Sequence, residues 1–224
     1  LNLTRGMNAR LKSLSLSAGS LSPVFSAETL AYTLTIWESF SSVQVTAVLE
    51  DPAASLTLQG SPAPSGSASD PISTGVASIV VKVTAADGVT TQTYTLTLNK
   101  QGLVFTTGGN AGWSEQTSTY YSPPKAWKSG FIADNQSTYL STTVTGPGTL
   151  TFYWRTNSED GYDLLTFHLD EVYQFEISGL TDWQLKSVPI PTGSHTLKWK
   201  YSKDHMISIG ADAGYVDEIV FTPQ

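Results

Sequence analysis

Acidic side chains gather in the stretch 158–170 (SEDGYDLLTFHLD), where the apolar run 164–167 predicts a β-strand. Other acids of the same half of the chain stand at expected strand ends or in glycine-containing turns. Carboxylates in such places can bind a hard cation, act in acid-base catalysis, or accept hydrogen bonds from backbone N–H groups at turns. The candidate metal ligands are Asp134, Glu159, Asp163, Asp204, Asp212 and Asp217.

Catalysis is the least supported of these three interpretations. A glycosidase holds two carboxyl groups about 5–10 Å apart across a cleft, a separation that Glu159 and Asp163 could reach in a loop. No second catalytic motif accompanies them, because the sequence has no G-x-S-x-G, no H-E-x-x-H and no phosphate-binding loop. The 3 histidines are scattered. The sequence therefore predicts a protein that is not an enzyme.

Calcium binding and a polar network both remain open for the acids. Calcium takes roughly six to eight oxygen ligands, which can come from loops far apart in the sequence, although no contiguous D-x-D-x-D-G loop is present. In the alternative, the acids accept backbone N–H groups and pair with Arg155 and Lys203. Either arrangement offsets the cost of removing carboxylates from water when they lie close to a core. We favour the network.

Aromatic side chains form a second candidate site, which would bind a ligand without reacting with it. Three of them flank the loop 122–125, and two more bracket an expected hairpin that contains Gly179. Planar rings can pack against the apolar faces of sugar rings, and exposed aromatic clusters often mark contact surfaces. For each ring singly, the alternative is that it covers one end of the core. The candidate ligand-binding residues are Tyr120, Tyr121, Trp127, Tyr173 and Trp183.

Composition limits the classes of protein that need to be considered. The chain has 224 residues, is 40% hydrophobic and contains no cysteine, which excludes disulfides and thiolate metal sites. A net charge of -7 without a cluster of Lys or Arg argues against binding to nucleic acid. No apolar run reaches the roughly 18 residues of a membrane span. The abundance of Ser, Thr and Gly suits a secreted or cell-surface bacterial protein.

Alternation of apolar and polar residues predicts an all-β protein made of two tandem β-sandwich domains, an immunoglobulin-like or cadherin-like sandwich followed by a jelly roll. Helical spacing is nowhere sustained. Up to residue 101 the chain has 5 basic and 6 acidic residues, whereas the remainder has 7 and 13 and holds 5 of the 6 tryptophans. We therefore expect one domain at 1–101, with 1–9 as a leading linker, and a second at 102–224. The expected strands are 32–36, 43–45, 56–58, 79–83 and 94–98 in the first domain, and 138–145, 148–155, 164–169, 172–177, 183–190, 194–201 and 215–221 in the second.

The start of the chain, LNLTRG, is similar to LTLNKQG at 96–102, which ends the last expected strand of the first domain. From this similarity we expect the chain to begin in the tail of a preceding module of the same kind.

Several motifs resemble known families. The segments LKSLSLSAG (11–19), LSPVF (21–25), YTLTI (32–36), VTAADG (83–88) and TYTLT (93–97) resemble the cadherin-like β-sandwich repeat of bacterial surface proteins, over residues 10–101. The segments GFIADNQS (130–137), FYWR (152–155), WKYSKD (199–204) and GADAGYVD (210–217) resemble a jelly-roll domain of secreted bacterial proteins that is related to the MAM and cleaved-adhesin modules, over 103–222. Gly214 and Tyr215 depart from that pattern, in which a small residue and a tryptophan are expected.

The resemblances imply a spacer or adhesion role for the first domain and raise the expectation of a structural Ca²⁺ in the second. Together with the aromatic residues, they lead us to expect a non-catalytic carbohydrate-binding or adhesion module of a larger secreted or cell-surface protein. Its expected partners are a polysaccharide or other glycan and neighbouring domains of the same polypeptide. The alternative is a purely structural spacer that presents a catalytic partner domain.

Overall fold

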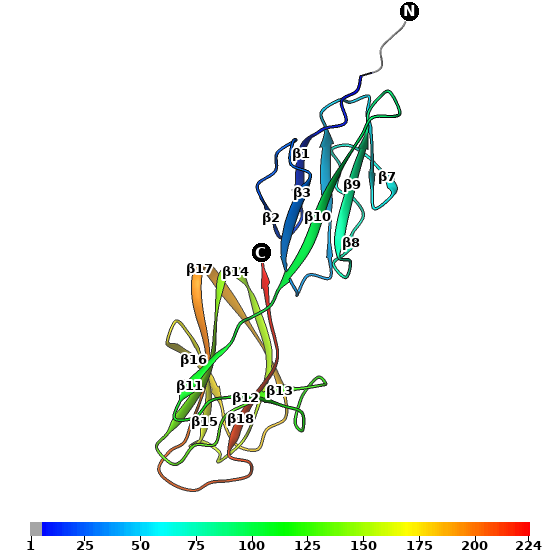
Figure 1. The fold of residues 1–224 in the computed structure, drawn as a ribbon. Helices are drawn as coiled ribbons and strands as arrows, with labels where there is room; N and C mark the ends of the chain where they lie inside the picture. Colours follow the sequence, from blue (N-terminus) through cyan, green and yellow to red (C-terminus); the bar gives the residue numbers. More distant parts are fainter. Residues whose placement is uncertain (1–5) are drawn as a thin grey trace, which may run out of the picture. The chain divides into compact units, whose positions relative to one another are not determined.

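The computed structural model describes residues 6–224, and the chain divides into two compact units, Leu1–Gly102 and Leu103–Gln224 (Figure 1). Residues 6–224 form strands and turns but no helix, so the predicted all-β class is confirmed. Within this range, no helix has the length and hydropathy needed to cross a membrane.

The first unit is built around one large sheet and two small ones. The large sheet has six strands in the order β2-β3-β10-β9-β6-β7, and β10 runs parallel to β3 but antiparallel to β9. The small sheets are the pairs β1-β5 and β4-β8. The strands are β1 (Leu11–Leu16), β2 (Ser20–Ser22), β3 (Ala31–Trp37), β4 (Ser42–Val43), β5 (Val45–Leu49), β6 (Ser55–Leu58), β7 (Ser61–Ala63), β8 (Ile72–Ser73), β9 (Ser78–Thr84) and β10 (Thr91–Gln101).

Period-2 alternation explains how these strands bury one face. In β9, Ile79, Val81 and Val83 are fully buried while the residues between them are not. In β10, Tyr94 and Leu96 are buried, and the Tyr94 hydroxyl accepts a hydrogen bond from the backbone N–H of Leu11. These β-branched and aromatic side chains fit a pleated, half-buried surface, and their burial forms the core of the first unit.

Residues 6–9 were expected to belong to a leading linker, but they contact the first unit. Ala9 is part of its buried core, and the Gly6 carbonyl accepts a hydrogen bond from the Asp87 N–H. The expected tail of a preceding module falls mainly on residues 1–5, which lie outside the described range.

The second unit contains two strands that are much longer than the sequence predicts. The expected pairs 138–145 and 148–155, and 183–190 and 194–201, were wrong as separate strands, because each pair forms one continuous strand. The strands are β11 (Thr106–Gly109), β12 (Ser114–Gln116), β13 (Ala126–Lys128), β14 (Ser137–Asn157), β15 (Leu164–Leu169), β16 (Val172–Ile177), β17 (Gln184–Ser202) and β18 (Ala213–Pro223).

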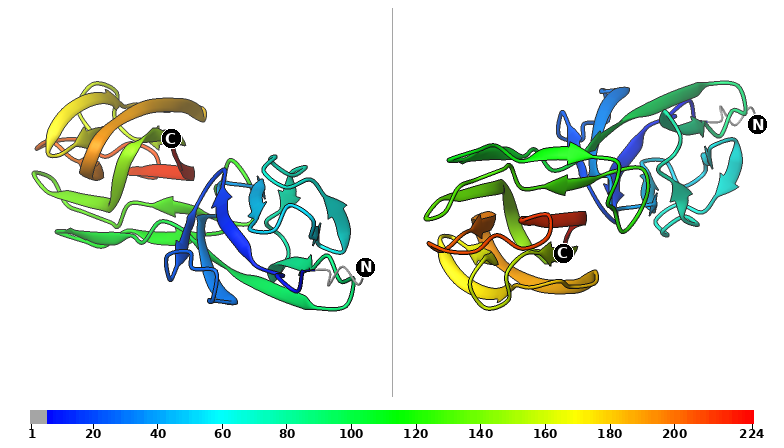
Figure 2. Two further views of the ribbon diagram at one scale, coloured as in Figure 1. Left: turned by 90° about the horizontal axis from the view of Figure 1, so that it is seen from above. Right: turned by 90° about the horizontal axis from the view of Figure 1, so that it is seen from below.

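β14 and β17 pair with each other along almost their whole length and take part in two layers (Figure 1). We define layer A as β11, β15, β16, residues 137–145 of β14 and residues 194–202 of β17. Layer B consists of β12, β13, β18, residues 148–157 of β14 and residues 184–190 of β17. Figure 2 shows β17, in orange, as a curved ribbon.

A register shift between Gly146 and Gly148 marks the point where β14 passes from one layer to the other. A Cβ atom on Gly146 would overlap the carbonyl oxygen of Pro191, and one on Gly148 would lie 2.5 Å from the Phe221 ring. Only glycine permits this close approach, so the sequence Gly-Pro-Gly makes a bulge in a continuous strand.

Aromatic rings fill the space between the two layers. Phe152 and Trp154, from layer B, lie 5.2 Å from Phe167 and 5.3 Å from Phe175 of layer A, respectively. Trp199 lies edge-on to Phe152 at 5.2 Å. Since Phe152, Trp154, Phe167 and Trp199 are fully buried, their alternation fixes which side chains of each strand face outward.

Candidate functional site

The outward-facing side of layer B carries aromatic and cationic side chains. On β14, Tyr153 and Arg155 alternate with the buried Phe152 and Trp154 and therefore point away from the core. Arg155 pairs in register with Tyr215 of β18. On the other side of β14, Trp183 directly precedes β17, and Leu185 pairs in register with Tyr153.

We call this surface the Trp183 face. Trp183 lies 6.4 Å from Tyr121 and 6.5 Å from Tyr215, edge-on to both rings. Leu185 is 54% exposed and Tyr121 is 48% exposed, so the face offers apolar surface to solvent. It consists of Tyr121, Tyr153, Arg155, Trp183, Leu185 and Tyr215.

A loop from a distant part of the chain completes the Trp183 face. The Tyr121 ring stacks on Tyr153 with 3.5 Å between centroids and 13° between planes. A side-chain hydrogen bond with Tyr121 raises the pKa of the Tyr153 hydroxyl. The carboxylate of Asp217 accepts hydrogen bonds from the backbone N–H groups of Tyr121, at 2.7 Å, and Ser122, at 2.9 Å. Asp217 thus fastens this loop onto the sheet.

Two cations lie among these rings. The Arg155 guanidinium carbon is 6.0 Å from the centroid of Trp183 and 5.8 Å from that of Tyr215. Lys128 Nζ is 5.8 Å from the Tyr215 centroid. Cations are attracted to the negative faces of aromatic rings at such distances, so the rings hold both charges in place.

The structure separates the five predicted ligand-binding aromatics. Tyr121 and Trp183 lie on the Trp183 face, while Tyr120 is 41% exposed in the same loop as Tyr121. Trp127 was expected in a loop but lies in β13, where it pairs in register with the buried Val216 and packs 5.4 Å from Phe105 on the core side. The alternative stated for each ring, that it covers the core, describes Trp127, because β13 turns this partly buried ring toward the core side.

Tyr173 does not belong to the Trp183 face either. It lies on β16, which pairs with β15 and not with β17, so the expected hairpin around Gly179 was wrong. Its ring lies edge-on to that of His168, with 6.1 Å between the centroids.

The predicted ligand-binding residues did not include Tyr153, Arg155 or Tyr215, which belong to the Trp183 face. A signal for the first two was present, since a strand was expected at 148–155 and alternation places Tyr153 and Arg155 on the face opposite to Trp154. Tyr215 faces the same way because it pairs in register with Arg155.

The acidic residues form a separate site around Lys203. Its ammonium group donates to Asp163 at 3.2 Å and to Ser208 at 3.0 Å, and also to Asp212. Asp134 is 3.8 Å away and half exposed, whereas the side chains of Lys203 and Asp163 are only 1% and 0% exposed. Asp163 also accepts a hydrogen bond from the Asp204 N–H, which ties two loops together. The Lys203 part of the expected network is therefore present.

Two of its expected members lie elsewhere. Asp217 lies beside the Trp183 face, where it holds the loop that carries Tyr121, and Arg155 contacts aromatic rings instead of acids. Their strand positions explain this, because both point outward from layer B.

Beside Lys203, carboxylate oxygens of Glu159, Asp163 and Asp204 lie within 4.8 Å of one another. Glu159 Oε2 is shielded from solvent and has no hydrogen-bond partner among residues 6–224. Desolvation, followed by the charges of Asp204 and Asp163, raises the pKa of Glu159. This surplus of negative charge fits a hard cation, with further oxygen ligands supplied by water.

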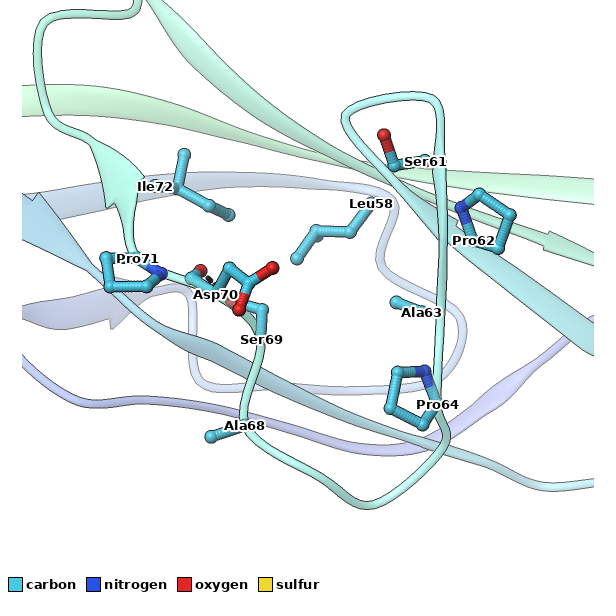
Figure 3. Close-up of a pocket in the computed structure, with 10 residues that line it drawn as sticks. All are labelled: Leu58, Ser61, Pro62, Ala63, Pro64, Ala68, Ser69, Asp70, Pro71 and Ile72. Atoms are coloured by element: carbon cyan, nitrogen blue, oxygen red, sulfur yellow. Dashed lines mark hydrogen bonds between the residues drawn. The ribbon is translucent and has the colours of Figure 1, made fainter.

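A groove of about 340 Å³ lies in the first unit, between β7 and the segment 68–72 (Figure 3). Prolines and small apolar side chains dominate its walls, and Asp70 lies among them. The Ser69 hydroxyl donates a hydrogen bond to the backbone carbonyl of Asp70. The groove has one carboxylate and no second titratable group, so it lacks the paired groups that acid-base chemistry needs.

The fold defines a protein of two β-sandwich units. For the first unit, comparison with known families gives the same architecture. Residues 11–101 match the model of the cadherin-like beta sandwich domain family, which confirms the resemblance of that segment. An 85-residue segment is 32% identical to a protein of Evansella cellulosilytica that is provisionally described as a membrane protein. This match spans 37% of the chain and 13% of that protein's length.

Solved structures similar to the chain include an adhesin domain and carbohydrate-binding modules. The K2 cleaved adhesin domain of Lys-gingipain is 18% identical, with a TM-score of 0.41 over 53% of this chain and 89% of that one. The carbohydrate-binding module TmCBM61, solved with beta-1,4-galactotriose, is 12% identical, with a TM-score of 0.40 over 54% of this chain and 88% of that one.

Proposed function

We propose that the second unit is a non-catalytic glycan-binding module of a larger secreted or cell-surface protein, and that the Trp183 face is its binding surface. The first unit would then serve as a cadherin-like spacer or adhesion domain. The single observation that carries this proposal is the cluster of partly exposed rings and cations on the outer side of layer B.

The chemistry of a sugar ring matches this surface. Axial C–H groups make one face of a pyranose apolar, while hydroxyl groups project from its rim. Trp183, Tyr121 and Leu185 offer apolar area for that face, and Arg155 and Lys128 offer hydrogen-bond donors for the rim. Rings kept at a solvent-exposed surface by a dedicated loop contact favour binding over core packing.

Replacement of two tryptophans tests the proposal. Trp183→Ala should abolish retention of the protein by polysaccharides in affinity gel electrophoresis and change the melting temperature little, because Trp183 lies outside the core. Trp127→Ala is the matched control, and it should lower the melting temperature without selective loss of binding, since Trp127 packs on Phe105. Equal retention of wild type and Trp183→Ala would contradict the proposal.

A purely structural role is the second candidate, and the family match of residues 11–101 favours it for the first unit. In this case a panel of polysaccharides would retain neither the wild-type protein nor any variant.

We further propose Glu159, Asp163 and Asp204 as ligands of a structural Ca²⁺. The support is their mutual distance and the unpartnered, solvent-shielded oxygen of Glu159. A ligand that binds only the folded state stabilises it, by about 2.7 kcal/mol at 100 times Kd. Calcium should therefore raise the melting temperature and EDTA should reverse the effect.

Glu159→Gln should remove this response to calcium, whereas Asp134→Asn, outside the triad, should keep it. A melting temperature that is the same in calcium and in EDTA would rule out the ion.

A further inference from the structure

Arg155 presents hydrogen-bond donors that the described part of the chain does not use. A guanidinium group has five N–H donors. Arg155 Nε is shielded from solvent and has no hydrogen-bond partner within residues 6–224, and no carboxylate in that range forms an ion pair with this side chain. Buried donors without a partner are rare in folded proteins because their desolvation is not compensated. An acceptor from outside the chain would satisfy them.

Neighbouring rings hold this guanidinium in a fixed position. Trp183 and Tyr215 approach it at 6.0 and 5.8 Å, and Tyr215 also contacts Lys128. Arg155 and Lys128 thus form a small positive patch around one tyrosine. A planar guanidinium held in this way is preorganised, so it loses little freedom when it binds an acceptor.

This positive patch lies in a domain whose net charge is negative. Beyond residue 101 the sequence has 13 acidic and 7 basic residues, and Lys125, Lys198 and Lys203 each have a carboxylate partner in the structure. Lys128, Arg155, Lys186 and Lys200 have none within the described range. Lys186 lies over the core rings of Trp154 and Phe175 and Lys200 lies in layer A, so Lys128 and Arg155 are the two of these four that lie next to the aromatic rings that would bind a sugar.

Asp217 lies on the strand next to Arg155, but it does not neutralise this positive patch. Asp217 pairs with Tyr153, and its oxygens accept the backbone N–H groups of Tyr121, Ser122 and Glu218. Its charge is thus compensated by the loop that it fastens.

From these contacts we propose that the Trp183 face binds an acidic polysaccharide, with a uronate carboxylate on Arg155 and a sugar ring against Trp183. This inference rests on the proposed glycan-binding function and names its ligand class. A carboxylate can accept two parallel N–H bonds from one guanidinium, and such charge-assisted pairs are stronger than bonds to neutral hydroxyls. Lys128 adds a second positive charge beside the same ring.

Isothermal titration calorimetry can test the ligand class. The probes are polygalacturonate, alginate, hyaluronan and glucuronoxylan, each beside its carboxyl-reduced neutral form. For the uronate polymer that binds most tightly, we expect affinity at least about 10-fold above that of its reduced form, because charge-assisted hydrogen bonds contribute more than neutral ones. Arg155→Gln should lower the affinity to that of the reduced form.

Two further variants make the result specific. Arg155→Lys keeps the charge but lacks the planar fork, so it should also lose most of the preference for the acid form. Lys200→Gln removes one charge from layer A, and it should bind like the wild type. Melting temperatures show whether each variant is folded.

The outcomes separate this inference from the function on which it depends. Equal affinity for acid and reduced forms, or an unchanged preference in Arg155→Gln, would overturn the uronate assignment and leave glycan binding standing. Equally tight binding of dextran sulfate would assign the patch to sulfate instead of carboxylate and would also overturn it. If the wild type binds no polymer of the panel, the proposed function fails as well.

Discussion

Lys203 joins acidic residues that are distant in the sequence. Its ammonium group contacts Asp163, which directly precedes β15, and Ser208 and Asp212, which lie in the loop 203–212, and it is almost completely buried. Burial alone would lower the pKa of Lys203, but the hydrogen bonds that its ammonium group donates to Asp212 and Asp163 raise it, so the group stays charged. Removal of Asp163 or Asp212 would leave the buried charge of Lys203 incompletely compensated.

A second charged pair gives the stability of the protein a pH dependence. His195 Nδ1 lies 2.7 Å from Asp170 Oδ2. This hydrogen bond raises the pKa of His195 and lowers that of Asp170. The His195 contribution is complete below the unfolded pKa of about 6.5 and is lost as the pH rises through the higher folded pKa. The Asp170 contribution is complete above about pH 3.9 and is lost as the pH falls further.

We therefore expect the pair to stabilise the protein most between about pH 4 and pH 6.5. The melting temperature of the wild type minus that of His195→Gln should be greatest in this window and should shrink from pH 7 to pH 9. A difference that stays constant over this range would contradict the contribution of the pair.

The burial of a single residue could be predicted where its strand was long enough to show which positions alternate toward the core. Trp154 and Trp199 lie in long strands whose alternation is visible in the sequence, and both are buried. Trp127 lies in a three-residue strand after Ser-Pro-Pro-Lys, so its neighbours show no alternation that would indicate burial. The identity of the partner on Lys203 also could not be predicted from the sequence, because Asp163 is 40 residues away and only the fold brings it close.

At the scale of elements, the loop 117–125 depends on a strand that follows it by almost a hundred residues. Asp217 of β18 accepts the N–H groups of Tyr121 and Ser122, and Tyr121 then stacks on Tyr153. The loop is thus ordered by charge-assisted hydrogen bonds, and its ring contributes to the Trp183 face.

Asp217→Ala should release this loop. The amide protons of Tyr121 and Ser122 should exchange faster with deuterium, because their acceptor is gone, while those of Phe152 and Trp154 in β14 should keep their protection. Hydrogen exchange followed by NMR gives the rate for each amide. Unchanged rates at Tyr121 and Ser122 would show that other contacts order the loop.

Strand positions were predictable from alternation, but the continuity of strands was not. Ile79, Val81 and Val83 show the period of β9 directly in the sequence. Gly146-Pro147-Gly148 has the composition of a turn, yet β17 pairs with residues on both sides of it and makes it a bulge. A turn and a bulge differ in long-range pairing, which no local sequence pattern records.

At the scale of the whole chain, the two units differ in the chemistry that they offer. The first unit has nearly balanced charge, a cadherin-like sandwich and a groove with one carboxylate. The second has most of the acids and tryptophans, and it carries both the Trp183 face and the Lys203 network. The change in composition near residue 101 predicted this difference, whereas the place of each site depended on strand pairing.

The most direct test of the account is the binding of polysaccharides by wild type and Trp183→Ala, measured on the same panel by affinity gel electrophoresis. We expect that at least one polysaccharide retards the wild type, and that Trp183→Ala, with nearly the same melting temperature, migrates freely. Retardation of both proteins to the same extent, or of neither, would contradict it.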